Sequence, residues 1–154
     1  MKKKLYALTL CVLATTLYAN PTEFDHYLQQ QQLIDEKFKI QNAKALNNLL
    51  AVLSEEDSRT LPLKMDANTV IDGLKLSANR TELTGLIITP DFPQLESQLG
   101  ANEVKQMLHR NLVQNCNIFF EHQYQRANPY AVSLQLNSGK QNYLLTIRHQ
   151  DCLP

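Results

Sequence analysis

The sequence predicts an α+β domain with a long N-terminal helix followed by two antiparallel β-hairpins and a helical segment between them. The hairpins are expected to form a roughly four-stranded sheet, covered by helices and pinned by one disulfide. Three observations lead to this class. Apolar residues recur at helical spacing within residues 20–57, two later stretches alternate with period two, and Cys116 and Cys152 flank the second stretch. We expect a single domain over residues 20–154, with the N-terminal helix at 20–57 and a hairpin–helix–hairpin core at 60–154.

Residues 1–19 have the composition and order of a secretory signal peptide. Lys2, Lys3 and Lys4 precede a mostly apolar run, and Ala19 supplies a small residue at the expected cleavage site. An uncleaved membrane anchor is the alternative, although the run is shorter than the roughly 20 residues that a membrane span needs. The signal-peptide interpretation places the protein in the bacterial periplasm, with no membrane span after removal of the leader.

Removal of the leader makes the domain mildly acidic. The full chain has 15 basic and 15 acidic side chains, and loss of the three leader lysines leaves an excess of three acids. Binding to a nucleic-acid backbone requires a basic face, so the composition argues against a nucleic-acid partner.

The first predicted helix begins after Thr22, whose hydroxyl suits the N-cap position. Phe24 and Tyr27 start an amphipathic stripe that continues in one or two pieces towards residue 57. Four successive glutamines interrupt the stripe: Gln29, Gln30, Gln31 and Gln32. They form either a polar surface that meets a partner or a solvated turn of helix.

Two hairpins follow from alternating apolar residues. The first spans residues 68–90 and carries Gly73 and Gly85 inside its strands, where each predicts a bulge or a close approach to a helix. The second joins residues 130–136 to 143–149 through a turn that contains Gly139. Between the hairpins, Gly100 is expected to interrupt a helical region that ends near Cys116.

Cys116 and Cys152 are the cysteines that remain once Cys11 is removed with the leader. An oxidising compartment favours a disulfide between them, which would stabilise the domain by roughly 3–4 kcal/mol in the chain-entropy model. Phe119 and Phe120 belong to the densest aromatic cluster of the chain. This cluster is either an exposed contact patch or packing against the last hairpin.

A short motif, LPLKMDANT, occupies residues 61–69, and Tyr143 and Asp151 accompany the two cysteines near the C-terminus. With these features, the chain resembles a group of small exported or membrane-tethered bacterial proteins of unsettled function. The resemblance covers about residues 60–152. It implies an α+β fold and a disulfide, and it implies no chemistry.

No pattern in the sequence predicts catalysis, a metal site or a cofactor. The four histidines, His26, His109, His122 and His149, lack metal-ligand spacing. Glu121 and His122 are adjacent near the aromatic cluster, which we interpret as a surface pair. A hydrolase built around His122 or His149 would need an acid and a nucleophile within hydrogen-bonding reach.

The sequence therefore predicts an exported, non-enzymatic protein that binds another envelope or secreted protein. It would be an accessory factor of an envelope, pilus or secretion assembly, or an immunity-type inhibitor. The predicted contacts are Phe24, Tyr27, the four glutamines Gln29–Gln32, Phe119 and Phe120, together with any open sheet edge. The alternative is a small-ligand carrier or sensor with a pocket between helix and sheet. The sequence does not indicate the oligomeric state.

Overall fold

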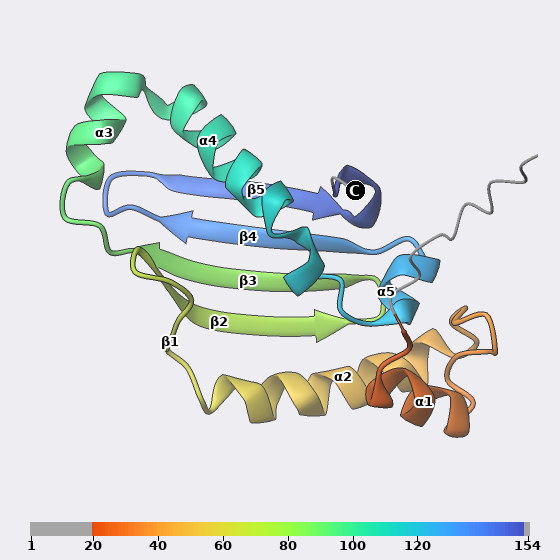
Figure 1. Cartoon of the computed structure of the whole chain (residues 1–154). Coiled ribbons are helices and arrows are strands. Elements are labelled where there is room, and N and C mark those ends of the chain that lie inside the picture. Colours follow the sequence, from red (N-terminus) through yellow and green to blue (C-terminus); the bar gives the residue numbers. More distant parts are fainter. Residues whose placement is uncertain (1–19, 153–154) are drawn as a thin grey trace, which may run out of the picture.

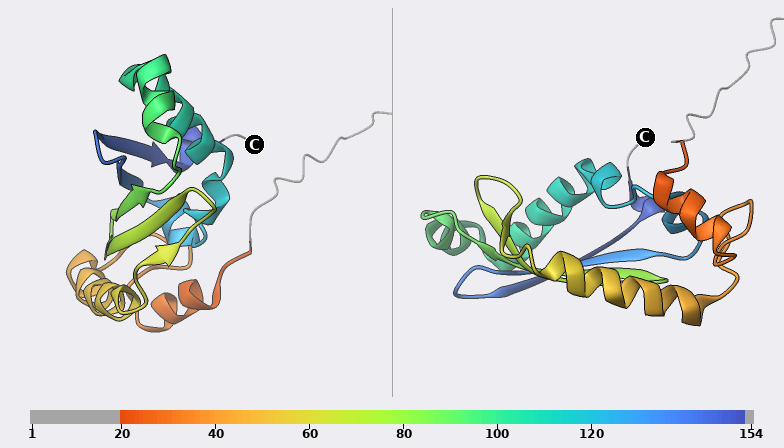
Figure 2. Two further views of the ribbon diagram at one scale, coloured as in Figure 1. Left: turned by 90° about the vertical axis from the view of Figure 1, so that its left-hand side faces the viewer. Right: turned by 90° about the horizontal axis from the view of Figure 1, so that it is seen from below.

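The computed structural model describes residues 20–152, and the predicted signal peptide at 1–19 lies outside them. A single sheet forms the centre of the domain, with α4, α5 and α1 on one side and α2 alongside an edge strand (Figures 1 and 2). The strands are β1 (Leu63–Lys64), β2 (Thr69–Ser77), β3 (Arg80–Ile87), β4 (Ala131–Asn137) and β5 (Asn142–Arg148). The helices are α1 (Glu23–Gln30), α2 (Ala43–Ser58), α3 (Phe92–Leu99), α4 (Ala101–Gln114), α5 (Gln123–Ala127) and the 3₁₀ turns η1 (Cys116–Ile118) and η2 (His149–Asp151). None of the helices within residues 20–152 has both the length and the apolar character required to cross a membrane.

The sheet has five strands in the order β1-β2-β3-β4-β5, one more than predicted, because Leu63 and Lys64 pair with β2. The two predicted hairpins are present as the antiparallel pairs β2–β3 and β4–β5. The sheet as a whole is mixed, because β3 and β4, which belong to different hairpins, pair in parallel. Residues 88–130 form a crossover that contains α3, α4, η1 and α5 and returns the chain to the end where β3 began.

The predicted long N-terminal helix is two helices, α1 and α2, separated by a turn over residues 31–42. Oδ1 of Asp35 accepts hydrogen bonds from the backbone N–H groups of Lys37 and Lys39, both at 2.8 Å. Gln32 and Phe38 have positive φ angles of 57° and 60°, which a continuous right-handed helix does not contain. The carboxylate therefore stabilises a turn where apolar spacing alone predicted more helix.

The glycines inside the first hairpin mark an irregularity at Gly73 and a close approach of strands at Gly85, not an approach to a helix. The β2–β3 register shifts between Ile71 and Gly73, which marks an irregularity in the strand pair. A Cβ atom at Gly85 would lie 2.5 Å from the carbonyl oxygen of Val70, closer than real Cβ atoms come to other atoms. Because glycine has no Cβ atom, Gly85 allows β3 to lie close to the backbone of β2.

Helix α2 covers the outer edge of β2, beyond the short strand β1. Oγ of Ser54 accepts from the backbone N–H of Leu76 at 2.7 Å, and Oδ1 of Asn47 accepts from that of Ala78 at 2.7 Å. These side chains occupy backbone donors that an added strand would need. Among the described strands, β1 and β5 are the two edges of the sheet, and each pairs with one neighbour only.

The predicted disulfide is confirmed. Cys116 and Cys152 are bonded with a Cα–Cα distance of 5.4 Å, inside the usual range. Cys116 is buried and opens η1, and Cys152 follows η2 at the end of the described chain. The bond thereby ties the segment after α4 to the segment after β5.

Candidate functional site

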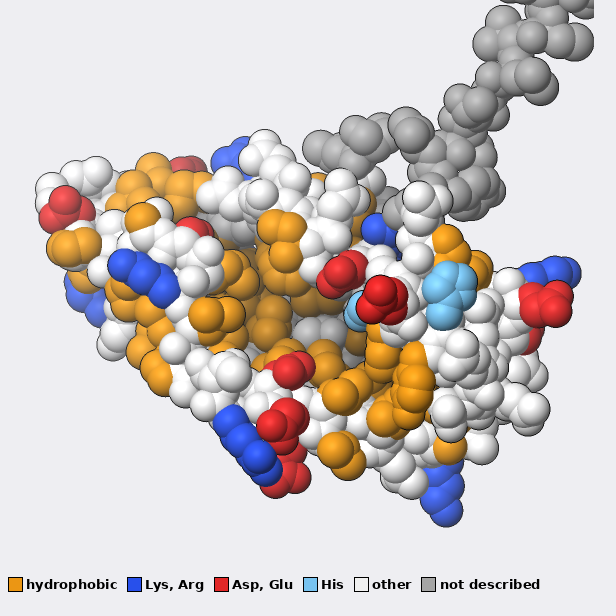
Figure 3. All heavy atoms as spheres, turned by 60° about the horizontal axis from the view of Figure 1, so that its bottom comes forward, with side chains coloured by type: hydrophobic (Ala, Val, Ile, Leu, Met, Phe, Trp, Pro, Cys, Tyr) orange, Lys and Arg blue, Asp and Glu red, His pale blue; other side chains and the backbone are white. Residues whose placement is uncertain are grey.

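A groove of about 250 Å³ opens on the helical face of the sheet, and we call it the apolar groove. Its lining residues are Met65, Asp66, Thr69, Leu108, Asn111, Leu112, Asn115, Ile118, Phe119, Leu134, Leu136 and Leu145. Figure 3 shows a hollow on this side of the molecule that is bordered mostly by hydrophobic side chains.

The floor and one wall of the apolar groove follow directly from local periodicity. Leu134 and Leu136 lie two residues apart on β4, so both point to the same face of the sheet, beside Leu145 of β5. Leu108 and Leu112 lie four residues apart on α4, so they share the face of the helix that meets the sheet. A helix wall above a strand floor leaves the hollow between them.

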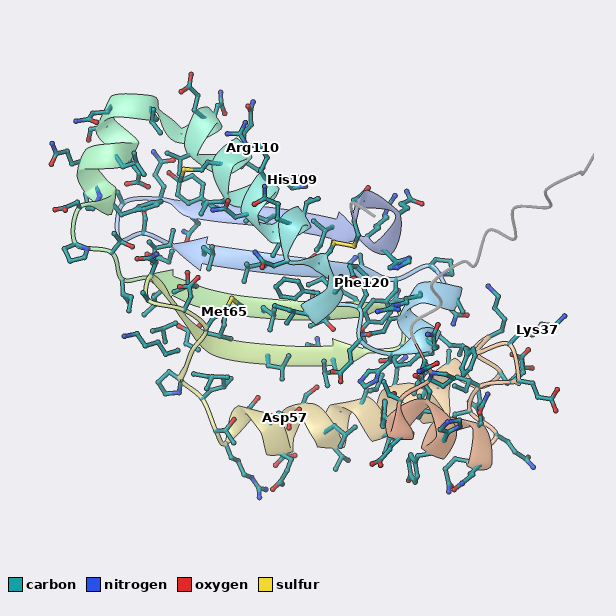
Figure 4. All side chains as sticks on the ribbon, viewed as in Figure 1. Lys37, Asp57, Met65, His109, Arg110 and Phe120 are labelled. Atoms are coloured by element: carbon teal, nitrogen blue, oxygen red, sulfur yellow. A yellow bond between two sulfur atoms is a disulfide. The ribbon has the colours of Figure 1, made fainter. Side chains whose placement is uncertain are left out.

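The rim of the apolar groove exposes large hydrophobic side chains from two separate segments of the chain. Ile118 of η1 is 73% exposed, and Met65 of the β1–β2 connection is 43% exposed. Figure 4 shows Met65 projecting from that connection towards the helical side of the sheet. Full burial of one such side chain against a partner would stabilise the complex by about 1.5–3 kcal/mol. The disulfide at Cys116 anchors the turn that carries Ile118.

The polar side chains of the apolar groove make local contacts. Nδ2 of Asn115 donates to the carbonyl of Asn111 at 2.8 Å, and Oδ1 of Asp66 accepts from the N–H of Asn68 at 2.7 Å. No histidine, serine or lysine is among the described residues that line the groove. The arrangement thus favours contact with apolar atoms, framed by a few polar groups.

The predicted contact residues on α1 lie at the other end of the sheet, where α1 packs against α5. The ring of Phe24 lies 5.0 Å from that of His122 and 6.3 Å from that of Tyr124, while Tyr27 is 43% exposed. Gln29 donates through Nε2 to the carbonyl of Asp35 at 3.2 Å. The remaining glutamines, Gln30, Gln31 and Gln32, are exposed at the end of α1 and in the turn after it. The structure therefore separates these residues from the apolar groove.

Phe119 and Phe120, which the sequence predicts as contacts with a partner, lie in different surroundings. Phe119 is half-buried and lines the apolar groove. Phe120 is fully buried, with ring centroids 6.4 Å from Tyr130 and 5.7 Å from His149, so it belongs to the core. The sequence carries no signal for Ile118 beyond its place beside the two phenylalanines, and none for Met65 beyond the short motif at 61–69.

A polar cluster joins α1 to α5. Oγ1 of Thr22 lies 2.8 Å from Nδ1 of His122 and donates to Oδ2 of Asp25 at 2.9 Å. Asp25 is fully buried and accepts from the backbone N–H groups of Gln123 at 2.9 Å and Tyr124 at 3.2 Å. Burial lowers the pKa of His122. In a catalytic triad the histidine lies between acid and hydroxyl, whereas here the hydroxyl lies between acid and histidine.

Within residues 20–152, no three His, Cys, Asp or Glu side chains are grouped as metal ligands would be.

No protein-family model and no curated protein matches the chain. Two solved structures resemble it. One is a protein of Pseudomonas aeruginosa described as secreted, with 13% identity, coverage of 72% of this chain and 96% of the other, and a TM-score of 0.45. The other is the pilotin of the type 2 secretion system of Vibrio vulnificus, with 10% identity, coverage of 73% and 96%, and a TM-score of 0.38. Both TM-scores are too low to establish a shared fold.

Proposed function

We propose that the chain is an exported, non-enzymatic protein that binds another envelope or secreted protein through the apolar groove. Such a protein would act as an accessory factor of an envelope, pilus or secretion assembly, or as an immunity-type inhibitor. The observation that carries the proposal is the exposed hydrophobic rim around a preformed apolar floor. Ile118 and Met65 are exposed and line the same groove as Leu134 and Leu136.

The bound segment is proposed to be an amphipathic helix of the partner. The floor is the face of a sheet whose strands β4 and β5 already pair with each other, and the wall is helix α4. Neither surface offers a row of unpaired backbone groups to an extended peptide. A segment that enters must therefore satisfy its own backbone hydrogen bonds, as a helix does, and contribute apolar side chains.

The size of the apolar groove favours this partner over a free small molecule. Small-molecule sites usually enclose about 300–1,000 Å³, and the groove holds about 250 Å³. The ligand-carrier alternative predicts a larger, closed pocket between helix and sheet. A groove of this size suits a few side chains that remain attached to a larger partner.

The proposal is tested by site-specific photocrosslinking in cells. A photoreactive amino acid replaces Met65 on the rim, and Val52 serves as the matched control. Val52 lies on α2, is 65% exposed and is outside the apolar groove. We expect one dominant envelope or secreted protein to be crosslinked from position 65 and not from position 52.

A second variant shows whether the groove itself carries the binding. Ile118→Asp places a charge on the rim, and loss of about 1.5–3 kcal/mol of apolar contact would weaken binding roughly tenfold to a hundredfold. Val52→Asp should leave the crosslink from position 65 unchanged. Equal crosslinking from both positions would contradict the proposal, as would a crosslink that survives Ile118→Asp in a folded variant. A bound small molecule in native mass spectrometry would favour the carrier alternative.

A further inference from the structure

A basic cleft of about 730 Å³ lies at the end of the sheet where β3 and β4 begin and β5 ends (Figure 1). Its cationic lining residues are Lys39, Arg80, Arg126 and Arg148, with His149 beside them. No aspartate or glutamate is among the described residues that line it. The four cations come from the α1–α2 turn, β3, α5 and β5, so only the folded chain brings them together.

Two of the arginines lie in one row across the sheet. Arg80 pairs in register with Ala131, and Ala131 pairs with Arg148. Paired residues point to the same face, and a strand spacing of about 4.8 Å places the two arginine Cα atoms about 10 Å apart. The next residues, Thr81 and Val132, are buried, so the row points away from the core. The short side chain of Ala131 leaves the space between the guanidinium groups open.

The other two cations are held in place by backbone carbonyls. Nε of Arg126 donates to the carbonyl of Phe120 at 2.6 Å, and Nζ of Lys39 donates to the carbonyl of Ala127. A guanidinium group has five N–H donors, so Arg126 retains donors for a ligand after this bond is made. The bond restricts the side chain before a ligand arrives, which lowers the entropy cost of binding.

The charges of the basic cleft are poorly compensated by the protein. Arg80 forms an ion pair with Glu82 at 3.5 Å, whereas Lys39, Arg126 and Arg148 form none with the described residues. At the end of β5, Oδ2 of Asp151 accepts from the backbone N–H of Arg148 at 2.7 Å. A domain with an excess of acids thus gathers cations at one end. An anion in the cleft would relieve their mutual repulsion.

We propose that the basic cleft binds a phosphate-bearing anion, with a phosphate group between Arg80, Arg126 and Arg148. Arginine suits this ligand because its planar N–H groups donate two parallel hydrogen bonds to phosphate oxygens. The cleft volume lies in the range of small-molecule sites, so a diphosphate or a phospholipid headgroup has sufficient room. The basic cleft shares no lining residue with the apolar groove, so this proposal does not depend on the proposed partner binding.

The first arm of the test uses inorganic pyrophosphate and isothermal titration calorimetry on the purified protein. The variants are Arg80→Ala and Arg148→Ala, both at exposed positions. Lys105→Ala on α4 is the control, because it removes an exposed charge outside the cleft. We expect each arginine variant to weaken binding by about tenfold or more, as loss of a charge-assisted pair does, and Lys105→Ala to leave it unchanged. Thermal unfolding of each variant confirms that it is folded.

The second arm distinguishes a headgroup from a soluble phosphate compound. The protein is sedimented with vesicles of phosphatidylcholine alone and with vesicles that also contain phosphatidylglycerol. Sedimentation with the anionic vesicles that is lost in Arg148→Ala assigns the cleft to a headgroup, and pyrophosphate binding without sedimentation assigns it to a soluble ligand. Absence of both kinds of binding overturns the proposal, as does an equal loss in Lys105→Ala.

Discussion

Replacing Asp25 with alanine should remove the contacts that hold α1 on α5. The side chain is fully buried and accepts four hydrogen bonds, two from Thr22 and one each from the backbone N–H groups of Gln123 and Tyr124. The bond from the backbone N–H of Thr22 belongs to the capping box of α1. The bonds from Gln123 and Tyr124 join segments almost a hundred residues apart in the sequence.

The expected loss follows from the two kinds of bond. Loss of a helix cap costs about 1 kcal/mol. Each buried bond from Gln123 or Tyr124 to the carboxylate contributes about 1.5–3 kcal/mol. Because bonds to one group are not independent, we expect Asp25→Ala to lower the free energy of unfolding by about 4 kcal/mol. That is a large part of the roughly 5–15 kcal/mol that stabilises an ordinary domain.

The measurement is urea-induced unfolding at neutral pH, followed by circular dichroism. Asp57→Ala is the control, because Asp57 is exposed at the end of α2 and should have almost no effect. Asp25→Asn is a milder variant that keeps the volume of the side chain. A loss of only about 1 kcal/mol in Asp25→Ala would equal the cap alone, and it would refute the idea that Asp25 fastens α1 to α5.

Three further predictions concern the rest of the domain. The Cys116–Cys152 bond joins residues 36 positions apart, so its reduction should lower the free energy of unfolding by about 4 kcal/mol. Alkylation of the protein without reductant should find no free thiol at these positions, and two free thiols would contradict the bond. Tyr143→Phe removes a 2.6 Å bond to the buried carboxylate of Glu96 and should cost about 2 kcal/mol in urea unfolding, whereas wild-type stability would show that this bond contributes nothing. Burial holds the pKa of His122 below that of the unfolded chain, so the unfolded state binds a proton first and stability falls as pH decreases through about 6.5. His122→Asn should flatten the fall measured by urea unfolding between pH 7.5 and pH 5.5, and an unchanged slope would assign it to other groups.

Both hairpins could be predicted because their signals are local. Leu134 and Leu136 alternate with polar residues on β4, and the same alternation recurs on β5. Since a shift by one residue would turn every apolar side chain to solvent, the pattern also determines the register. The disulfide could also be predicted from the sequence, because only two cysteines remain once the predicted leader is removed.

The N-terminal helix shows where local spacing misleads. Apolar residues continue at intervals near three and four through residues 31–42, yet the carboxylate of Asp35 binds two backbone N–H groups and stabilises a turn. Such side-chain bonds compete with helix formation over only a few residues. The parallel pairing of β3 and β4 was also missed, because it depends on the path of the whole crossover at 88–130.

The two candidate sites show the same difference between what local sequence predicts and what long-range contacts determine. The sequence by itself determined which residues of β4 and α4 are apolar and which cysteines can pair, because these properties depend on neighbours in the chain. That Met65 and Ile118 line the same apolar groove depends on the tertiary structure, because they lie far apart in the sequence. The fold also places Arg80, Arg126 and Arg148 around one cleft, although residues 20–152 have three more acidic than basic side chains. A net charge is a sum over the chain, whereas a binding site depends on which distant side chains the fold brings together.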